Sequence, residues 1–292
     1  MNMFCSLFGY TKQAYYKCST GSRHRVIKEE QAKDAVLQIR RQMPRIGTRK
    51  LHFMLKEQFK TDQIKVGRDK LFTLLGKEGL LIVKRKKYTI TTNSKHWMHK
   101  YPNLIKDITV HRPEQLWVAD ITYLETQESN SYLHLITDAY SKQVMGYELC
   151  NDMEASSTLK ALKMAISNRH YPDEPLTHHS DRGLQYCSKL YVNHLLKNNI
   201  QISMTENGDP YENAIAERMN GILKDEFGLG EKHNDLADAL HQTRQSIQTY
   251  NQLRPHLSCH YLTPLQMHQQ QTITIKTWKK KTSRVDSTLE VL

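Results

Sequence analysis

Three acidic residues occur in contexts where a carboxylate could do chemistry. Asp120 lies inside an apolar stretch predicted to be a strand, Asp181 directly follows another short strand, and Glu217 falls within a predicted helix. A carboxylate in a buried strand is costly without a partner or a metal ion. Acidic residues at the carboxyl ends of strands in open α/β sheets lie where ligands bind. Metal ligation is therefore one interpretation of this set.

Taken singly, each of these acids also has an ordinary structural explanation. Asp120 could be a hydrogen-bonded aspartate at a strand end, and Asp181 could cap a turn. Glu217 could belong to a solvated polar face, because residues 213, 217, 220 and 224 follow one another at helical offsets of four, three and four.

The elements that would position the acids follow a clear order. Strands are predicted over residues 116–124, 132–138 and 144–149, then a helix over 155–167, a short strand into 177–179, a helix over 190–196 and a strand over 200–204. Residues from 212 onward are predicted to be helical. This order predicts an α/β layer with a three-strand meander followed by parallel crossovers.

Charge divides the chain into two unequal parts. Residues 1–110 contain 24 Lys and Arg against 8 Asp and Glu, whereas residues 111–292 contain 18 against 22. Such a basic N-terminal part favours a module that meets a polyanion, although a basic surface can also serve solubility alone.

The basic part is predicted to contain short helices. Residues 7–16 suggest two helical pieces about a Gly turn, with Thr11 as an N-cap, and a further helix is expected from Lys28 to Pro44. Two more helices are expected from residue 48 and from residue 68. A hairpin over residues 80–90 would resemble a wing. The alternative is a three-helix protein-interaction bundle with a solvated charge run.

The DNA-contacting residues expected in this module are basic. Arg68 and Lys70 lie in the first turn of the third helix, where a recognition helix meets base edges. The hairpin tip would place a run of four bases against phosphates, namely Lys84, Arg85, Lys86 and Lys87.

The joint spacing of the acids resembles a known signature. Asp120, sixty intervening residues, Asp181, thirty-five intervening residues and Glu217, with Lys224 seven further on, resemble the DDE motif of retroviral integrases and related bacterial transposases. The sequences over residues 117–123, 136–141, 179–183, 213–217 and 250–256 resemble the second-reading-frame transposase of a large insertion-sequence family, and the likeness covers nearly the whole chain.

Two departures and two rival acids qualify this resemblance. The zinc-binding His/Cys module of retroviral integrases is absent, which fits the bacterial branch, and Met219 stands where many relatives carry an aromatic residue. Glu206 and Glu212 follow Asp181 by twenty-five and thirty-one positions, short of the family spacing, so Glu217 is the preferred third acid.

The resemblance implies a fold and a mechanism. The fold would be an RNase H-like mixed five-stranded sheet with flanking helices, preceded by a small all-α helix-turn-helix module. Asp120, Asp181 and Glu217 would hold two Mg²⁺ or Mn²⁺ ions. Water would then free a 3′-hydroxyl that attacks a second phosphodiester, and the lack of a GxxxxGK[ST] element fits a reaction without ATP.

Further roles follow from the same resemblance. Lys224 would contact DNA near the cut, and His179 and Arg182 would orient ligands or phosphates, or form structural hydrogen bonds. Residues 250–256 would pack the last helix against the sheet or, as an alternative, contact DNA. The expected partners are the terminal inverted repeats of an element, target DNA, further copies of the chain on DNA and an upstream-frame partner protein.

Two other functions remain open at this point. An RNase H-type nuclease would draw a further acid from the start of the helix after the meander, where Asp152 or Glu154 could supply it. A DNA-binding regulator without activity would keep the acids as structural residues. The basic N-terminal part and Lys224 weigh against the nuclease.

The expected layout has five parts. These are a helix-turn-helix fragment (1–27), a winged helix-turn-helix module (28–90), a linker (91–112), the catalytic core (113–271) and a basic tail (272–292). No apolar run approaches the roughly 18 residues of a membrane span, and the N-terminus lacks the features of a signal peptide. We therefore expect a bacterial protein of the cytoplasm, associated with the nucleoid. Five scattered Cys without a CxxC motif argue against a disulfide framework or a four-ligand zinc site.

Overall fold

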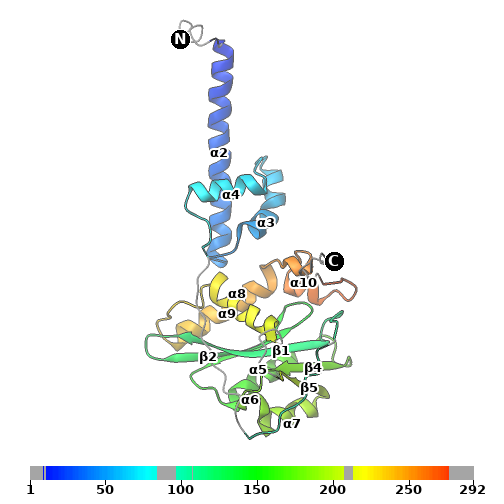
Figure 1. Cartoon of the computed structure of the whole chain (residues 1–292). Coiled ribbons are helices and arrows are strands. Elements are labelled where there is room, and N and C mark those ends of the chain that lie inside the picture. The colour runs from blue at the N-terminus through cyan, green and yellow to red at the C-terminus, as the bar shows by residue number, and fades with distance from the viewer. Residues whose placement is uncertain (1–8, 10, 84–96, 107, 207–212, 276–292) are drawn as a thin grey trace, which may run out of the picture.

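The computed structural model describes residues 9, 11–83, 97–106, 108–206 and 213–275. Three helices near the N-terminus pack together above an α/β layer (Figure 1). They are α2 (Lys12–Gln42), α3 (Thr48–Thr61) and α4 (Arg68–Lys77). Within the described part of the chain, every helix is too short or too polar to cross a bilayer.

Helix α2 is longer than the sequence indicates. Thr11 caps it as predicted, since its Oγ1 accepts a hydrogen bond from the Ala14 N–H at 3.1 Å. The helix expected to begin at Lys28 instead continues from Lys12 without a break, so the two-piece prediction is wrong. Gly21 is tolerated inside it, and no Pro occurs before Pro44 to stop it.

The predicted positions of α3 and α4 are confirmed. Leu51 and Leu55 of α3 and Leu71 and Leu75 of α4 are buried in one core, together with Ala32 and other small residues of α2. Residues 80–83 are not in a strand, and the rest of the predicted wing lies outside the described residues, including Lys84, Arg85, Lys86 and Lys87.

A five-stranded sheet forms the middle of the α/β layer. Its strands are β1 (Leu116–Glu125), β2 (Asn130–Asp138), β3 (Val144–Cys150), β4 (Leu176–Ser180) and β5 (Ile200–Met204), in the spatial order β3-β2-β1-β4-β5. The β1–β2 and β2–β3 pairs are antiparallel, and β4 joins β1 and β5 in parallel. The meander and the parallel crossovers predicted from the sequence are confirmed, and this is an RNase H-like α/β fold.

Helices cover both faces of the sheet (Figure 1). One face carries α5 (Ala155–Ser167), α6 (Leu184–Cys187) and α7 (Lys189–Lys197), and the other carries α8 (Ala214–Glu226), α9 (Leu236–Leu253), the 3₁₀ turn η2 (Leu257–Cys259) and α10 (Pro264–His268). Alternate β1 side chains serve the two cores: Trp117 and Ala119 face α5, while Leu124 faces α8. Gly146 of β3 is required for the close approach of α5, because a Cβ there would lie 2.1 Å from the Ala161 carbonyl oxygen.

A buried charge cluster joins the N-terminal helices to the α/β layer. Glu226, at the end of α8, accepts hydrogen bonds at 2.8 Å from Lys50 Nζ of α3 and from Arg254 Nη2. The Arg45 N–H also donates to the Glu226 carbonyl at 3.0 Å. Burial outweighs the attraction of Glu226 and lowers the pKa of Lys50 to about 8. Arg254 belongs to the segment 250–256, which packs the end of α9 as the sequence predicts.

Part of the predicted linker is docked on the sheet. The Met204 N–H of β5 donates to the Pro102 carbonyl at 3.2 Å, and the Leu104 N–H donates to Ser203 Oγ at 2.9 Å. Residues 97–106 contain no helix or strand, as expected, yet residues 102–104 are hydrogen-bonded to β5.

Candidate active site

Two of the three acids meet at one edge of the sheet because of strand register. The parallel pairing of β1 with β4 ends at Val118 opposite His179. Asp120, within β1, follows Val118 by two residues, and Asp181, directly after β4, follows His179 by two residues. The same register continued by two residues therefore puts the two aspartates opposite each other, at the carboxyl end of β4.

Helix α8 brings the third acid to this edge. Asn220 Nδ2 donates to Asp120 Oδ2 at 2.7 Å, and Asn213 Nδ2 donates to the Ala119 carbonyl at 3.4 Å. Glu217 precedes Asn220 by one helical turn and is exposed. Asn213 and Asn220 are each only 8% exposed, so this polar face of α8 lies on β1 and is not a solvated stripe.

Negative charge is left uncompensated around Asp120. Burial, then the charge of Asp181, and to a smaller extent that of Glu217, raise the pKa of Asp120 from 3.8 to about 7, against the opposing hydrogen bonds of the Ile121 N–H and Asn220. Asp120 is only partly exposed and lines a pocket, while protein atoms enclose it on most sides. Such a site attracts a cation that can replace the missing counter-charge.

The pocket at the acids is small and partly aromatic. Asp120 and Asp181 line it together with Tyr123, Gly183 and Tyr186. A Cβ at Gly183 would lie 3.0 Å from Asp181 Oδ1, and the Gly183 N–H donates to that same oxygen at 3.0 Å. Burial, and then the charge of Asp181, raise the pKa of Tyr186 well above 10. The glycine thus lets the backbone hold the carboxylate closely.

Lys224 adds a positive charge at the edge of this pocket. Its Nζ lies 4.1 Å from the centroid of the Tyr123 ring, over the ring face. The residue is two turns beyond Glu217 on α8 and is half-buried.

The other predicted site residues have defined surroundings. His179 is fully buried, with its Nδ1 2.9 Å from Ser203 Oγ of β5, and Arg182 is half-buried after β4. Arg68 forms an ion pair with Asp69 at 2.7 Å, and Lys70 forms one with Glu29 at 3.1 Å.

Of the two rival acids, the structure describes Glu206 alone, and this residue is engaged elsewhere. Glu206 pairs with Lys106, whose hydrogen bond is the main cause of its lowered pKa, and Glu212 lies outside the described residues. Asp152 Oδ1 accepts hydrogen bonds from the Glu154 N–H at 3.0 Å and from Ser157 Oγ at 2.8 Å, which ties it to the start of α5.

A second acidic cluster lies in the same domain and was not anticipated from the sequence. We call Glu114, Asp138, Arg169 and His268 the Glu114 cluster. Glu114 accepts from Arg169 Nε at 2.9 Å and its Oε1 lies 3.2 Å from His268 Nε2, while Asp138 Oδ1 accepts from the Ser141 N–H at 2.7 Å. Asp138 sits in the segment 136–141, whose sequence likeness gave no indication of this partner set.

Ligand distances separate the two groups of acids. Among the described residues, Glu114, His170 and His268 form the group of three whose ligand atoms all lie within 4.8 Å of one another, and the set of Asp120, Asp181 and Glu217 is not so tightly drawn together. The sequence also gave no notice of the Asn220 contact to Asp120, although its offset of three from Glu217 placed it on the same helix face.

Comparisons with known proteins place this geometry in a family. The Integrase core domain family matches residues 110–210, and a second Integrase core domain family matches residues 198–264. The chain is 34% identical over 259 residues to the IS600 uncharacterized 31 kDa protein of Shigella sonnei, covering 86% of this chain and 92% of that protein. It is 30% identical over 227 residues to the transposase for IS629 of Shigella sonnei, covering 75% of each.

A third relative and two solved structures are also similar to the chain. Transposase InsF for IS3A of Escherichia coli K12 is 33% identical over 194 residues, covering 66% of this chain and 67% of that protein. The HTLV-2 integrase catalytic core domain in complex with magnesium has a TM-score of 0.43 at 22% identity, covering 54% of this chain and 97% of that one. A simian T-cell lymphotropic virus intasome chain has a TM-score of 0.48 at 18% identity, covering 82% and 76%.

The matched domain and the bacterial relatives define a class of enzyme. It is the DDE polynucleotidyl transferases with an integrase-type core on an RNase H-like fold. The chain belongs to the insertion-sequence transposases of this class. Integrase-type cores of this class normally work with divalent metal ions.

Proposed function

We propose that Asp120, Asp181 and Glu217 form the catalytic centre of this transposase and hold two Mg²⁺ ions. The observation that carries the proposal is the uncompensated charge at Asp120, whose pKa is raised to about 7 by burial and by its two acidic neighbours. Hard carboxylate oxygens are the ligands that Mg²⁺ takes in proteins, commonly one or two together with waters and substrate oxygens. The donor set therefore fits the ion.

The residues of the chain would divide the work. Asp120 and Asp181, fixed by adjacent strands, would supply the rigid ligands, and Glu217 would complete the set from α8. Asn220 would orient Asp120 through its 2.7 Å hydrogen bond. When bound, two divalent ions activate an attacking oxygen and stabilise the leaving oxygen of an in-line displacement at phosphorus.

The same arrangement supports both steps of transposition. In the first step a water oxygen bonds to phosphorus as the P–O bond to the 3′ oxygen breaks, which leaves a 3′-hydroxyl. In the second step that hydroxyl attacks another phosphodiester and one P–O bond replaces another. Lys224 would bind a phosphate beside the acids, and His179 and Arg182 would support the strand ends that carry them.

The DNA and protein partners follow from the family. We propose that the chain acts on the terminal inverted repeats of its own element and on target DNA, as a homo-oligomer assembled on those ends, with an upstream-frame protein as a further partner. In the basic module, Arg68 and Lys70 would turn from their acidic neighbours to phosphates, alongside the run of residues 84–87. The division into residues 1–27, 28–90, 91–112, 113–271 and 272–292 stays part of this proposal.

A strand-transfer assay tests the proposal. Purified full chain, with duplexes carrying the element ends and Mg²⁺ or Mn²⁺, is expected to nick and join DNA, and Asp181→Asn is expected to bind the same duplex while losing both products by a factor on the order of 10³ or more. Glu206→Gln removes an acid of the same region that pairs with Lys106, and should stay within about twofold of wild type.

Two results would contradict the assignment. Equal joining by wild type and Asp181→Asn would exclude that carboxylate from the centre. Degradation of unrelated RNA–DNA hybrids, without preference for the element ends, would favour a nuclease of the RNase H type instead.

A further inference from the structure

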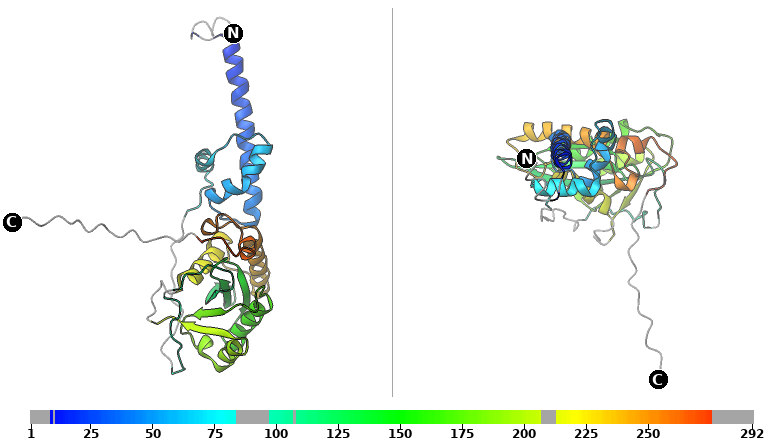
Figure 2. Two further views of the ribbon diagram at one scale, coloured as in Figure 1. Left: turned by 90° about the vertical axis from the view of Figure 1, so that its right-hand side faces the viewer. Right: turned by 90° about the horizontal axis from the view of Figure 1, so that it is seen from above.

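The N-terminal half of α2 stands apart from the packed helices (Figures 1 and 2). We call residues 12–27 the α2 stalk. Every stalk side chain that the structure describes is exposed. By contrast, Ala32, Ala35 and Val36 in the second half of the helix are between 0 and 4% exposed. One half of α2 is thus packed in a core, and the other half projects from it.

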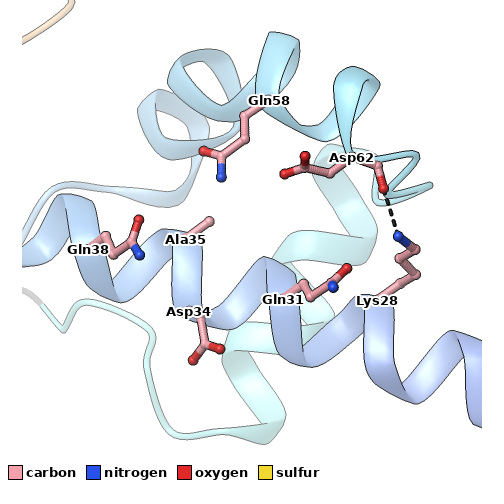
Figure 3. Close-up of a pocket in the computed structure, with 7 residues that line it drawn as sticks. All are labelled: Lys28, Gln31, Asp34, Ala35, Gln38, Gln58 and Asp62. Carbon is pink, nitrogen blue, oxygen red and sulfur yellow. Dashed lines mark hydrogen bonds between the residues drawn. The ribbon is translucent and has the colours of Figure 1, made fainter.

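Lys28 marks the junction between the two halves. Its Nζ donates to the Asp62 carbonyl at the end of α3 at 2.7 Å, beside a polar pocket that Gln31, Asp34 and Gln58 help to line (Figure 3). From this residue onward, α2 lies against α3 and α4. Before it, the helix runs outward for about 24 Å, at 1.5 Å per residue.

Charge also changes at this junction. The stalk contains Lys12, Lys17, Arg23 and Arg25 and not one Asp or Glu. The packed half contains acids that pair with nearby bases: Glu30 with Lys33 at 2.7 Å, and Glu29 with Lys70 at 3.1 Å. Positive charge in the stalk is therefore not offset by any acid of its own segment.

The stalk sequence is a poor match for a helical protein partner. A coiled-coil seam needs apolar residues at two of every seven positions over several turns. Between Tyr16 and the adjacent, exposed Val26 and Ile27, the chain runs Lys-Cys-Ser-Thr-Gly-Ser-Arg-His-Arg. Gly21 costs about 1 kcal/mol relative to Ala in a helix, and an isolated helix of this length is marginal in water. The stalk therefore offers a partner mainly its positive charge.

We propose that the α2 stalk binds duplex DNA, lying along the phosphate backbone and contributing sequence-independent affinity. The inference rests on the proposed function only in taking DNA as the polyanion. The four bases have no acid in their own segment, and a duplex presents about 14 phosphates over the same length of about 24 Å, at about one negative charge per 1.7 Å of axis, so a phosphate is within reach of each base. The first turn of α4 is less suited, because Arg68 and Lys70 already face acids at 2.7 and 3.1 Å.

The test uses the full chain with the four stalk bases replaced, K12Q/K17Q/R23Q/R25Q. A matched control removes four exposed lysines of the α/β layer, K163Q/K189Q/K197Q/K232Q, so that the net charge changes equally. Binding is measured by fluorescence anisotropy with a labelled random-sequence duplex of about 40 base pairs, over about 50–300 mM KCl and without divalent ions.

The stalk variant is expected to bind at least about tenfold more weakly near 150 mM salt, and its slope of log affinity against log salt should fall by about 3 to 4, because each phosphate contact contributes about 0.9. The control should keep most of the wild-type slope. A stalk variant with wild-type affinity and slope, or a control that loses as much, would overturn the proposal.

Hydrogen exchange supplies a second, independent readout. Amide protection over residues 12–27 should rise when the duplex is added. Protection that rises instead with protein concentration in the absence of DNA would show that the stalk binds a second copy, and would overturn the DNA assignment. Neither experiment involves cleavage, so a failed stalk leaves the catalytic proposal intact, and an inactive acid centre leaves the stalk result readable.

Discussion

The α/β layer contains two groups of carboxylates with opposite electrostatic surroundings. In the Glu114 cluster, Arg169 and His268 surround Glu114, and their hydrogen bonds outweigh burial and lower its pKa to about 2. At Asp120 burial is the main cause that raises the pKa to about 7, and the charges of Asp181 and Glu217 add to it. A carboxylate with cationic partners stabilises the fold, whereas one left among like charges is available for chemistry.

The positions of the two groups explain the difference. The Glu114 cluster fastens α10 to the base of the sheet, since His268 lies in that helix and its ring nitrogens face Glu114 at 3.2 Å and Asp138 at 3.8 Å. In the other group, Asp120 and Asp181 line a pocket at the end of β4. One group closes an interface within the protein, and the other faces a space for a ligand.

The largest expected effect separates activity from stability. Asp120→Asn should abolish strand joining by a factor on the order of 10³ or more, because it removes a ligand oxygen, yet it should leave the metal-free protein as stable as wild type or more so, because it removes repulsion. Joining assays and urea unfolding at pH 8 measure the two quantities. A variant that is active, or that unfolds far more easily than wild type, would break the comparison.

The opposite pattern is expected in the Glu114 cluster. Glu114→Gln leaves Arg169 buried without its counter-charge and leaves His268 with Asp138 alone, and should lower the free energy of unfolding by about 3–5 kcal/mol. Glu148→Gln is the control: Glu148 pairs with Lys160 at 3.2 Å near the surface, and such pairs contribute about 1 kcal/mol or less. Equal stability of Glu114→Gln and the control in urea titrations would contradict the assignment of a structural role.

The pH dependence of stability sharpens the comparison with smaller effects. Asp120 binds its proton more tightly in the folded protein, so its stabilising contribution is complete below about pH 4 and is lost as the pH rises to about 7. The Asp120→Asn variant should therefore gain on wild type across this window. The carboxylates of Asp138 and Glu114 outweigh burial and raise the pKa of His268 to about 9, so its contribution is complete below about pH 6.5 and is lost as the pH rises through 9.

Unfolding titrations at several pH values resolve the two windows. His268→Gln should be less stable than wild type at low pH, and this difference in the free energy of unfolding should disappear between about pH 6.5 and 9. That range lies above the pH range in which Asp120 acts. If the Asp120→Asn and wild-type curves stay parallel between pH 4 and 7, the carboxylate does not carry the uncompensated charge described above.

The sheet and most helices could be predicted from the sequence because local patterns determine them. Alternation and apolar periodicity predict the bounds of strands and helices within a few residues, as in α5 and β5. The N-cap at Thr11 could also be predicted from its residue type and position. The length of α2 was missed because its exposed half has no apolar periodicity to mark it. Helix α6 was missed because four residues are too few to show a pattern.

The candidate site was only partly readable. Asp120, Asp181 and Glu217 could be related to one another from the sequence because their spacing resembles that of the DDE motif. The burial of Asn213 and Asn220 against β1 could not be foreseen, since a polar stripe is usually solvated. The Glu114 cluster unites residues 114, 138, 169 and 268 from four distant segments, and no local pattern links them.

Anomalous diffraction from crystals grown with Mn²⁺ tests the central claim most directly. We expect strong manganese peaks between the carboxylate oxygens of Asp120 and Asp181, within reach of Glu217, and their loss in Asp181→Asn. Manganese at Glu114, His170 and His268, the group whose ligand atoms already lie within 4.8 Å, with none at Asp120 and Asp181, would contradict the account.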